Sequence, residues 1–222
     1  MGRLIDEAAT LIFDCDGVVL DSNRLKTEAF RIAAEPYGDA AAAALVTYHV
    51  ANGGVSRYVK FAHFLDHIVP EHAPDTTGPG LEGLLSAYAE AVRAGLLSCA
   101  VADGLDALRA ATPRAAWMIV SGGDQSELRE IFTARSLAEY FDAGIFGSPD
   151  TKHEILAREL AAGTIRRPAL FLGDSRFDHE AATRAGIGFV FVSTWSEWAE
   201  GAALAETDGF PVIPRLADLQ ET

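Results

Sequence analysis

Short apolar runs that alternate with helical patterns limit the fold of this chain more than any other feature of its sequence. The runs are rich in Val, Ile, Phe and Leu, as is typical of strands buried on both faces of a parallel sheet. They occupy residues 10–14, 115–120, 143–146, 169–172 and 188–192, with a weaker run at 212–213. Helical spacing occupies residues 105–111, 125–137, 153–162, 178–185 and 195–205. The alternation predicts an α/β fold with a doubly wound, mostly parallel sheet. The last helix is expected to start at a capping box between Thr194 and Glu197.

One segment interrupts this alternation. Between the first apolar run and residue 115 the sequence has no strand pattern, and the stretch is too long for a simple crossover. Helical patterns occupy most of it, at residues 24–35, 40–50, 56–69 and 81–94. We therefore predict an α/β core of residues 1–20 and 98–222, with an all-helical domain of residues 21–97 inserted into it.

The charge and composition exclude several classes of partner. The formal net charge of −14 argues against nucleic acid and anionic membranes, because both favour a basic surface. No apolar run approaches the roughly 18 residues of a membrane-spanning helix, and residues 1–10 lack the pattern of a signal peptide. Cys15 and Cys99 are too few for a disulfide framework. We expect a cytoplasmic monomer or homodimer that binds anions through a local basic cluster or a bound cation.

Two carboxylates stand at the end of the first predicted strand, in the stretch Asp14-Cys15-Asp16-Gly17-Val18. Residues two apart on a strand point to the same face, so Asp14 and Asp16 are expected to crowd one small volume and repel each other. A shared proton, a basic neighbour or a metal ion has to compensate for this repulsion.

Polar residues also follow three of the later runs. Ser121 follows the second, Lys152 comes shortly after the third, and Asp174 follows the fourth, with Asp178 four residues on. In open α/β sheets ligands bind beyond the carboxyl ends of the strands. The sequence therefore predicts that these side chains converge with the two acids at one edge of the sheet.

The order and spacing of these groups resemble the four motifs of the haloacid dehalogenase superfamily, over nearly the whole chain. The helical insertion is similar to the α-helical, C1-type cap of phosphoglycolate phosphatases and β-phosphoglucomutases. The resemblance implies a Rossmann-like core and a Mg²⁺-dependent phosphatase. Such an enzyme hydrolyses a small phosphate monoester, here a small phosphorylated metabolite, through an aspartyl-phosphate intermediate.

The resemblance assigns the catalytic roles to four residues. Asp14 is the nucleophile, and Asp16 protonates the leaving alcohol and then activates water. Ser121 and Lys152 hold the transferring phosphoryl oxygens. Simpler interpretations stay open: the two acids as turn residues, Ser121 as part of a turn before a helix capped by Asp124, and Lys152 as a solvated lysine.

The same resemblance implies a Mg²⁺ site made of oxygen ligands. Asp14, the backbone carbonyl of Asp16, and Asp174 hold the ion, and Asp178 orients Lys152 or a water on the metal. Asp178 could instead only stabilise the N-terminus of a helix.

Substrate contacts are expected from both parts of the chain. Gly17 and Gly122 lie within the motifs of the core. In the insertion, Gly54, Arg57 and Lys60 belong to a stretch similar to the Gly-x-Ser-Arg segment of β-phosphoglucomutase caps, where the arginine contacts the distal phosphate of the substrate. Arg57 and Lys60 could instead be ordinary solvated helix residues.

Three other functions compete with the phosphatase. A sugar-phosphate mutase would use the same phospho-aspartate. A 2-haloacid dehalogenase is disfavoured because displacement of a halide needs no acid, which would leave Asp16 without a role. A non-catalytic phospho-binding or signalling module is disfavoured by the long helical insertion and by the spacing of the two acids.

Overall fold

The computed structural model describes residues 5–220 and has a six-stranded parallel sheet at its centre. The strand order is β3-β2-β1-β4-β5-β6, so β1 lies in the middle and the ends of β1, β2 and β4 adjoin. The strands are β1 (Thr10–Phe13), β2 (Ala116–Asp124), β3 (Ile145–Ser148), β4 (Ala169–Gly173), β5 (Gly188–Val192) and β6 (Val212–Ile213). The prediction of a doubly wound α/β fold with a helical insertion is confirmed.

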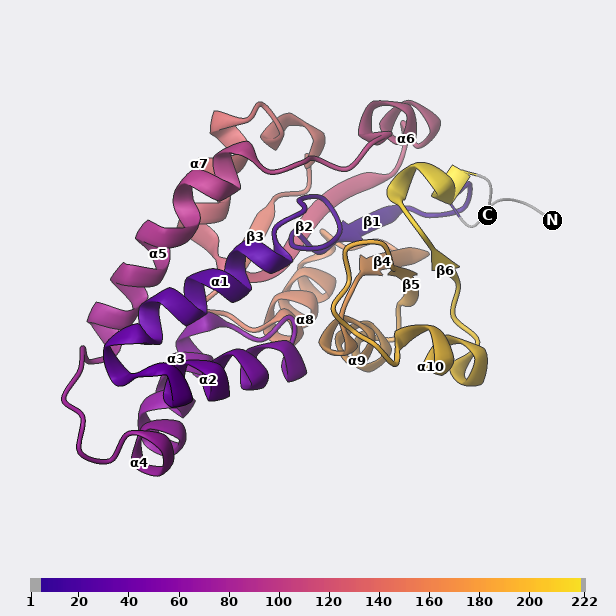
Figure 1. The fold of residues 1–222 in the computed structure, drawn as a ribbon. Helices are drawn as coiled ribbons and strands as arrows, with labels where there is room; N and C mark the ends of the chain where they lie inside the picture. Colours follow the sequence, from indigo (N-terminus) through magenta and orange to yellow (C-terminus); the bar gives the residue numbers. More distant parts are fainter. Residues whose placement is uncertain (1–4, 221–222) are drawn as a thin grey trace.

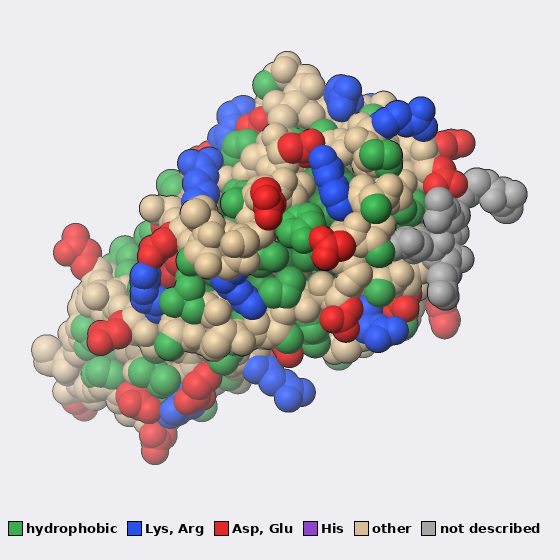
Figure 2. All heavy atoms as spheres, turned by 90° about the horizontal axis from the view of Figure 1, so that it is seen from above, with side chains coloured by type: hydrophobic (Ala, Val, Ile, Leu, Met, Phe, Trp, Pro, Cys, Tyr) green, Lys and Arg blue, Asp and Glu red, His purple; other side chains and the backbone are tan. Residues whose placement is uncertain are grey.

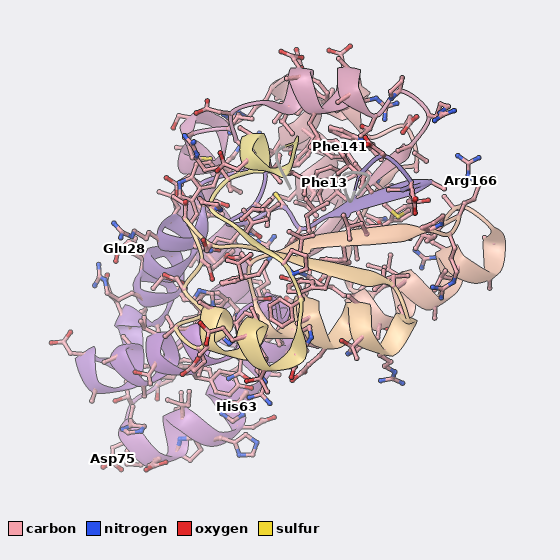
Figure 3. The ribbon with its side chains drawn as sticks, turned by 90° about the vertical axis from the view of Figure 1, so that its right-hand side faces the viewer. Phe13, Glu28, His63, Asp75, Phe141 and Arg166 are labelled. Carbon is pink, nitrogen blue, oxygen red and sulfur yellow. The ribbon has the colours of Figure 1, made fainter. Side chains whose placement is uncertain are left out.

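Helices cover both faces of the sheet (Figure 1). Leu11 and Phe13 of β1 belong to the hydrophobic cluster of one face and Ile12 to that of the other, as the alternation of side chains along a strand requires. On the first face Phe13 lies beside Phe141 (Figure 3), with ring centroids 5.6 Å apart. The first face is covered by α6 (Leu105–Ala111), α7 (Gln125–Ala134), η3 (Ala138–Tyr140) and η4 (Leu216–Gln220), and the second by α8 (Lys152–Ala162) and α9 (Arg176–Ala185).

Helices also fill the insertion between β1 and β2 (Figure 1). Phe30, Phe61 and Tyr88 pack together at its centre. The chain enters and leaves the insertion side by side, because the Asp21 amide donates to the Ala100 carbonyl at 3.0 Å. The elements are α1 (Asn23–Ala34), η1 (Glu35–Tyr37), α2 (Asp39–Ala51), α3 (Arg57–His63), the π-helical turn η2 (Phe64–Ile68), α4 (Val69–His72) and α5 (Leu81–Ser98).

The prediction of a helix over residues 195–205 is wrong at its start. Residues 195–200 form a loop, and α10 spans Gly201–Asp208. The hydroxyl of Ser196 donates to the backbone carbonyl of Asp174 at 2.5 Å. This long-range hydrogen bond fixes the segment as a loop against the end of β4, and a local capping pattern cannot anticipate it.

Acidic and basic side chains are interspersed on the face shown in Figure 2, and the basic ones form no continuous patch on that face. Across residues 5–220, no helix combines the length and the apolar character needed to cross a membrane.

Candidate active site

A buried chain of ion pairs links three of the predicted site residues. Asp14, directly after β1, has its Oδ2 atom 2.7 Å from Nζ of Lys152, the first residue of α8. The same ammonium group also contacts Oδ1 of Asp178 in the first turn of α9. All three side chains are buried. The lysine thus connects two carboxylates that are far apart in the sequence.

Asp174 completes a cluster of carboxylates at the end of β4. Oxygen atoms of Asp14, Asp174 and Asp178 all lie within 4.8 Å of one another, which is close enough to hold a metal ion. Asn23 of α1 donates from Nδ2 to Asp174 at 2.7 Å and to the Trp195 carbonyl at 2.8 Å. The first helix of the insertion therefore contributes a side chain that orients Asp174.

Asp178 has a structural role as well as a contact with the lysine. Its Oδ2 atom accepts hydrogen bonds from the Ser175 hydroxyl at 2.7 Å and the Ser175 amide at 3.1 Å, in a capping box at the start of α9. Its Oδ1 atom accepts from Lys152. Because both of its oxygens are engaged, Asp178 is better suited to fixing Lys152 than to binding an ion directly.

Asp16 points away from this cluster. Its Oδ2 atom lies 2.5 Å from Nζ of Lys26, and its Oδ1 atom accepts from the Ser22 hydroxyl at 2.6 Å. The carboxylate of Asp16 therefore lies outside the group of side chains that could hold a metal ion. The prediction gives Asp16 a contact with the ion through its backbone carbonyl only. The repulsion between Asp14 and Asp16 is relieved because each has its own lysine.

The pKa values reflect this difference in partners. Burial and the charge of Asp178 raise the pKa of Asp14 to about 7, and Lys152 opposes the shift only in part. Burial and the charges of Asp14 and Asp178 raise the pKa of Asp174 well above its ordinary value. Burial is the largest influence on Asp16 and would raise its pKa, but the charge and hydrogen bond of Lys26, with the Ser22 hydroxyl and Lys152, together hold the pKa of that carboxyl below its ordinary value.

The cluster fits a hard divalent cation. Lys152 pairs with two of the three buried carboxylates, Asp14 and Asp178, and Asp174 has no ammonium partner among the described residues, so negative charge exceeds positive charge at this point. An ion beside Asp14 and Asp174 would stabilise their charged forms, and an all-oxygen set of ligands is the type that Mg²⁺ prefers.

Two glycines in the core allow close approach of other groups. A Cβ atom on Gly17, which has φ +73°, would lie 2.1 Å from Oδ2 of Asp174. A Cβ atom on Gly122 would lie 2.3 Å from the carbonyl oxygen of Gly54 in the insertion. A side chain at Gly17 or Gly122 would therefore displace the cluster or the insertion.

Ser121 is buried beside Gly122. Its hydroxyl accepts a hydrogen bond from the Gly123 amide at 3.0 Å.

The segment after Ser121 also has its expected structural function. Asp124 caps α7, because its carboxylate accepts from the Glu127 amide at 2.9 Å. The same residue accepts from the Tyr58 hydroxyl at 2.8 Å. This turn therefore both starts a helix and contacts the insertion.

A cavity of about 1010 Å³ lies between the sheet and the insertion. The core lines it with Asp14, Asp16, Asp174 and Gly122, and the insertion with Gly54, Arg57 and Lys60. Ser121, Lys152, Asp178 and Gly17 do not line it. Lys152 instead contacts Asp14, which lines the cavity, and Asp178 contacts Lys152. The cavity thus brings together most of the residues predicted from the two halves of the sequence.

The two basic residues of the insertion have different partners. Arg57 is paired with Glu127 of α7, with Nη2 to Oε2 at 2.5 Å, and its guanidinium lies 4.8 Å from the ring centroid of Tyr88. Nζ of Lys60 lies 2.7 Å from Nδ1 of His49. An anion would have to replace Glu127 to bind Arg57, whereas Lys60 has no acidic partner to replace among residues 5–220.

Sequence reasoning missed several residues of this site, among them Asn23, Lys26, His49 and Glu127. Only Lys26 has a signal in the sequence, because the chain has only three lysines and fifteen arginines. Each lysine of so small a set is a candidate for a specific role. The other partners depend on tertiary contacts and leave no local pattern.

Comparison with known proteins identifies the family. The model of the haloacid dehalogenase-like hydrolases matches residues 8–186, most of the chain. The chain therefore belongs to the haloacid dehalogenase-like hydrolase family, as the motifs predicted. The sequence matches none of the curated proteins with which it was compared.

Solved structures share the fold at low sequence identity. A predicted phosphoglycolate phosphatase from Haemophilus somnus is 17% identical, with a TM-score of 0.75, and the match covers 96% of this chain and 97% of that one. A predicted phosphatase from Clostridium acetobutylicum is 16% identical, with a TM-score of 0.72 and 97% of both chains covered. CbbY from Rhodobacter sphaeroides, solved in complex with phosphate, is 19% identical, with a TM-score of 0.70 and 96% of both chains covered.

Proposed function

We propose that this protein is a Mg²⁺-dependent phosphatase that hydrolyses a small phosphate monoester through an aspartyl-phosphate on Asp14. The observation that carries the proposal is the position of Asp14. Its carboxylate lines the cavity, lies 2.7 Å from the Lys152 ammonium and belongs to the carboxylate cluster with Asp174. A nucleophile that attacks a dianionic ester needs positive charge beside it, which Lys152 and an ion held with Asp174 would supply together.

The reaction consists of two displacements at phosphorus. In the first, a carboxylate oxygen of Asp14 bonds to phosphorus, the ester P–O bond breaks, and the leaving alcohol takes the proton of Asp16. In the second, Asp16 accepts a proton from water as the water oxygen attacks phosphorus, which releases phosphate and restores Asp14. Asp16 must leave Lys26 to carry the first proton. Lys152 and Ser121 stabilise charge on the transferring oxygens.

Mg²⁺ held by Asp14, the Asp16 backbone carbonyl and Asp174 would offset the repulsion between the ester and the carboxylates. The remaining requirement is exclusion of water. In this proposal residues 21–97 form a cap that closes over the core of residues 1–20 and 98–222. The cavity lined by both parts and the ion pair between Arg57 and Glu127 support it.

Phosphate release from a panel of phosphate esters, with Mg²⁺ and with a chelator, tests the proposal. Asp14→Asn removes the nucleophile at nearly constant shape, so turnover is expected to fall to the uncatalysed level while the circular dichroism spectrum stays unchanged. Undiminished release by Asp14→Asn, or release that persists in chelator, would contradict the mechanism.

A sugar-phosphate mutase is the second candidate, because the cavity extends from Asp14 to Lys60 and has room for more than a phosphate group. Such an enzyme would isomerise a sugar phosphate with little net release of phosphate. Measuring both products in the same reaction separates the two functions.

A further inference from the structure

The cavity between the sheet and the insertion is lined by apolar side chains that the proposed chemistry does not use. Val46 and Val50 lie one turn apart on α2, so they share a face of that helix. The core contributes Trp198, from the loop before α10, and Leu204 of α10. We call these four side chains the apolar lining. Both parts of the chain therefore supply apolar surface to the cavity that also holds Asp14.

Aromatic packing fixes the ring of Trp198. Its centroid lies 5.3 Å from that of Phe191 of β5, in edge-to-face geometry, and 6.3 Å from that of Phe210. Gly201 begins α10 and lets the ring approach the helix, because a Cβ atom there would lie 2.9 Å from Cε3 of Trp198. A ring held in this way loses little conformational freedom when a ligand packs against it.

Two hydrogen bonds tie Trp198 to the end of β4. Its amide donates to the Ser196 hydroxyl at 3.0 Å, and that hydroxyl donates to the backbone carbonyl of Asp174 at 2.5 Å. The core alone therefore sets the separation between the ring and the carboxylate cluster. A ligand whose phosphate lies at Asp14 would meet the ring at a fixed distance.

The charged residues of this loop are both acidic. Glu197 and Glu200 line the same cavity, so an anionic group beside Trp198 would meet like charge. The apolar lining itself offers no hydrogen-bond acceptor and a single donor, the indole N–H of Trp198. An uncharged group with apolar surface is therefore the chemistry that suits this part of the cavity.

We propose that the apolar lining binds the alcohol part of the substrate, so that the preferred ester is the phosphate of an alcohol with an alkyl or aromatic group. The inference rests on the proposed function, because it assumes that the phosphate lies at Asp14. The cavity of about 1010 Å³ has room for both ends of such a molecule. Each methylene that leaves water for this lining should raise kcat/KM about fourfold.

Ethyl, butyl and hexyl phosphate test this with Mg²⁺ present. Their alcohols have nearly the same acidity, so the chain length changes the contact and leaves the chemistry constant. We expect kcat/KM to rise by about fourfold for each methylene that reaches the lining. Glucitol 6-phosphate has the same six-carbon chain as hexyl phosphate, with hydroxyls along it, and should react about tenfold or more slowly in kcat/KM. Equal or faster turnover of glucitol 6-phosphate would overturn the proposal.

Two variants locate the effect. Trp198→Ala should reduce the gain to less than about twofold for each methylene. Val50→Ala tests the α2 side of the cavity at an exposed position, and should lower kcat/KM for hexyl relative to ethyl phosphate by about threefold. Val59→Ala is the matched control, because Val59 is exposed on α3 and does not line the cavity. A dependence on chain length that is the same in all three variants as in the wild-type protein would overturn the role of the lining.

Binding measured without turnover separates this inference from the proposed function. In the Asp14→Asn background, calorimetric titration should show tighter binding and a more negative heat-capacity change from ethyl to hexyl phosphate, and adding Trp198→Ala should remove both trends. If the wild-type protein hydrolyses none of the esters but these trends are present, the phosphatase proposal fails and the apolar site stands. Hydrolysis of all three alkyl esters at equal rates, with binding independent of chain length, gives the reverse result.

Discussion

Replacing Lys60 by Met should stabilise the protein more at pH 6 than at pH 9. Burial and the charge of Lys26 lower the pKa of Lys60 from 10.5 to about 7. Between these values the unfolded chain holds a proton at this position that the folded chain has lost. The free energy of unfolding of the wild-type protein therefore rises with pH in this window, and the full penalty applies below pH 7.

The size of the effect follows from the same two values. The difference between 10.5 and about 7 corresponds to about 5 kcal/mol of lost stability when the lysine is protonated in both states. At pH 9 the folded protein carries Lys60 neutral, and the penalty is about 2 kcal/mol. Met titrates in neither state, so its advantage should be about 3 kcal/mol larger at pH 6. Loss of the hydrogen bond to His49 subtracts about 1 kcal/mol at either pH.

Urea unfolding of both proteins at pH 6 and pH 9 measures this difference, with Arg31→Met as the control because it removes an exposed positive charge from α1. The difference in the free energy of unfolding between the proteins at each pH removes the contribution of the titratable groups that they share. The charged or titratable groups that act on Lys60 or contact it are His49, Lys26, Asp16, Glu197 and Lys152. A stability gain that is equal at the two pH values would refute the reasoning, because it would mean that water or a carboxylate already compensates for the ammonium group.

Three further changes test the site itself. Gly122→Ala places a methyl group against the Gly54 carbonyl and should lower kcat/KM by about tenfold or more with the core still folded, as read by steady-state kinetics and circular dichroism. Lys152→Met leaves the buried carboxylate of Asp14 without its ammonium partner; we expect a loss of about 3–5 kcal/mol in urea unfolding together with loss of phosphate release. Added Mg²⁺ should raise the thermal midpoint of the wild-type protein but not of Asp174→Asn, in differential scanning fluorimetry; equal shifts would place the ion elsewhere.

The sequence was sufficient for the fold because apolar runs alternate with helical patterns, and polar residues follow the first run and three of the later ones. Topology then brings Asp14 and Asp174 together, since β1 and β4 are neighbours in the sheet. The same logic predicted that Lys152 and Asp178 would lie near them. The roles assigned to these residues stay predictions until turnover is measured.

Other parts of the site depend on contacts that no local pattern encodes. Lys26 meets Asp16 only because α1 turns back over the end of β1, and Arg57 meets Glu127 only because the insertion folds onto α7. The loop at residues 195–200 differs from the predicted helix for the same reason. Its Ser196 hydroxyl is held by a backbone carbonyl 22 residues earlier in the chain.

The burial of every lysine also determines how the protein meets chemical reagents. In the folded state the chain offers acylating or reductively alkylating agents no exposed side-chain amine, since Lys26, Lys60 and Lys152 are all enclosed. Lys26 and Lys60 line the cavity between the sheet and the insertion, so a separation of the two would expose these amines to the reagent. The rate of covalent labelling at these two positions therefore measures how often the cavity opens.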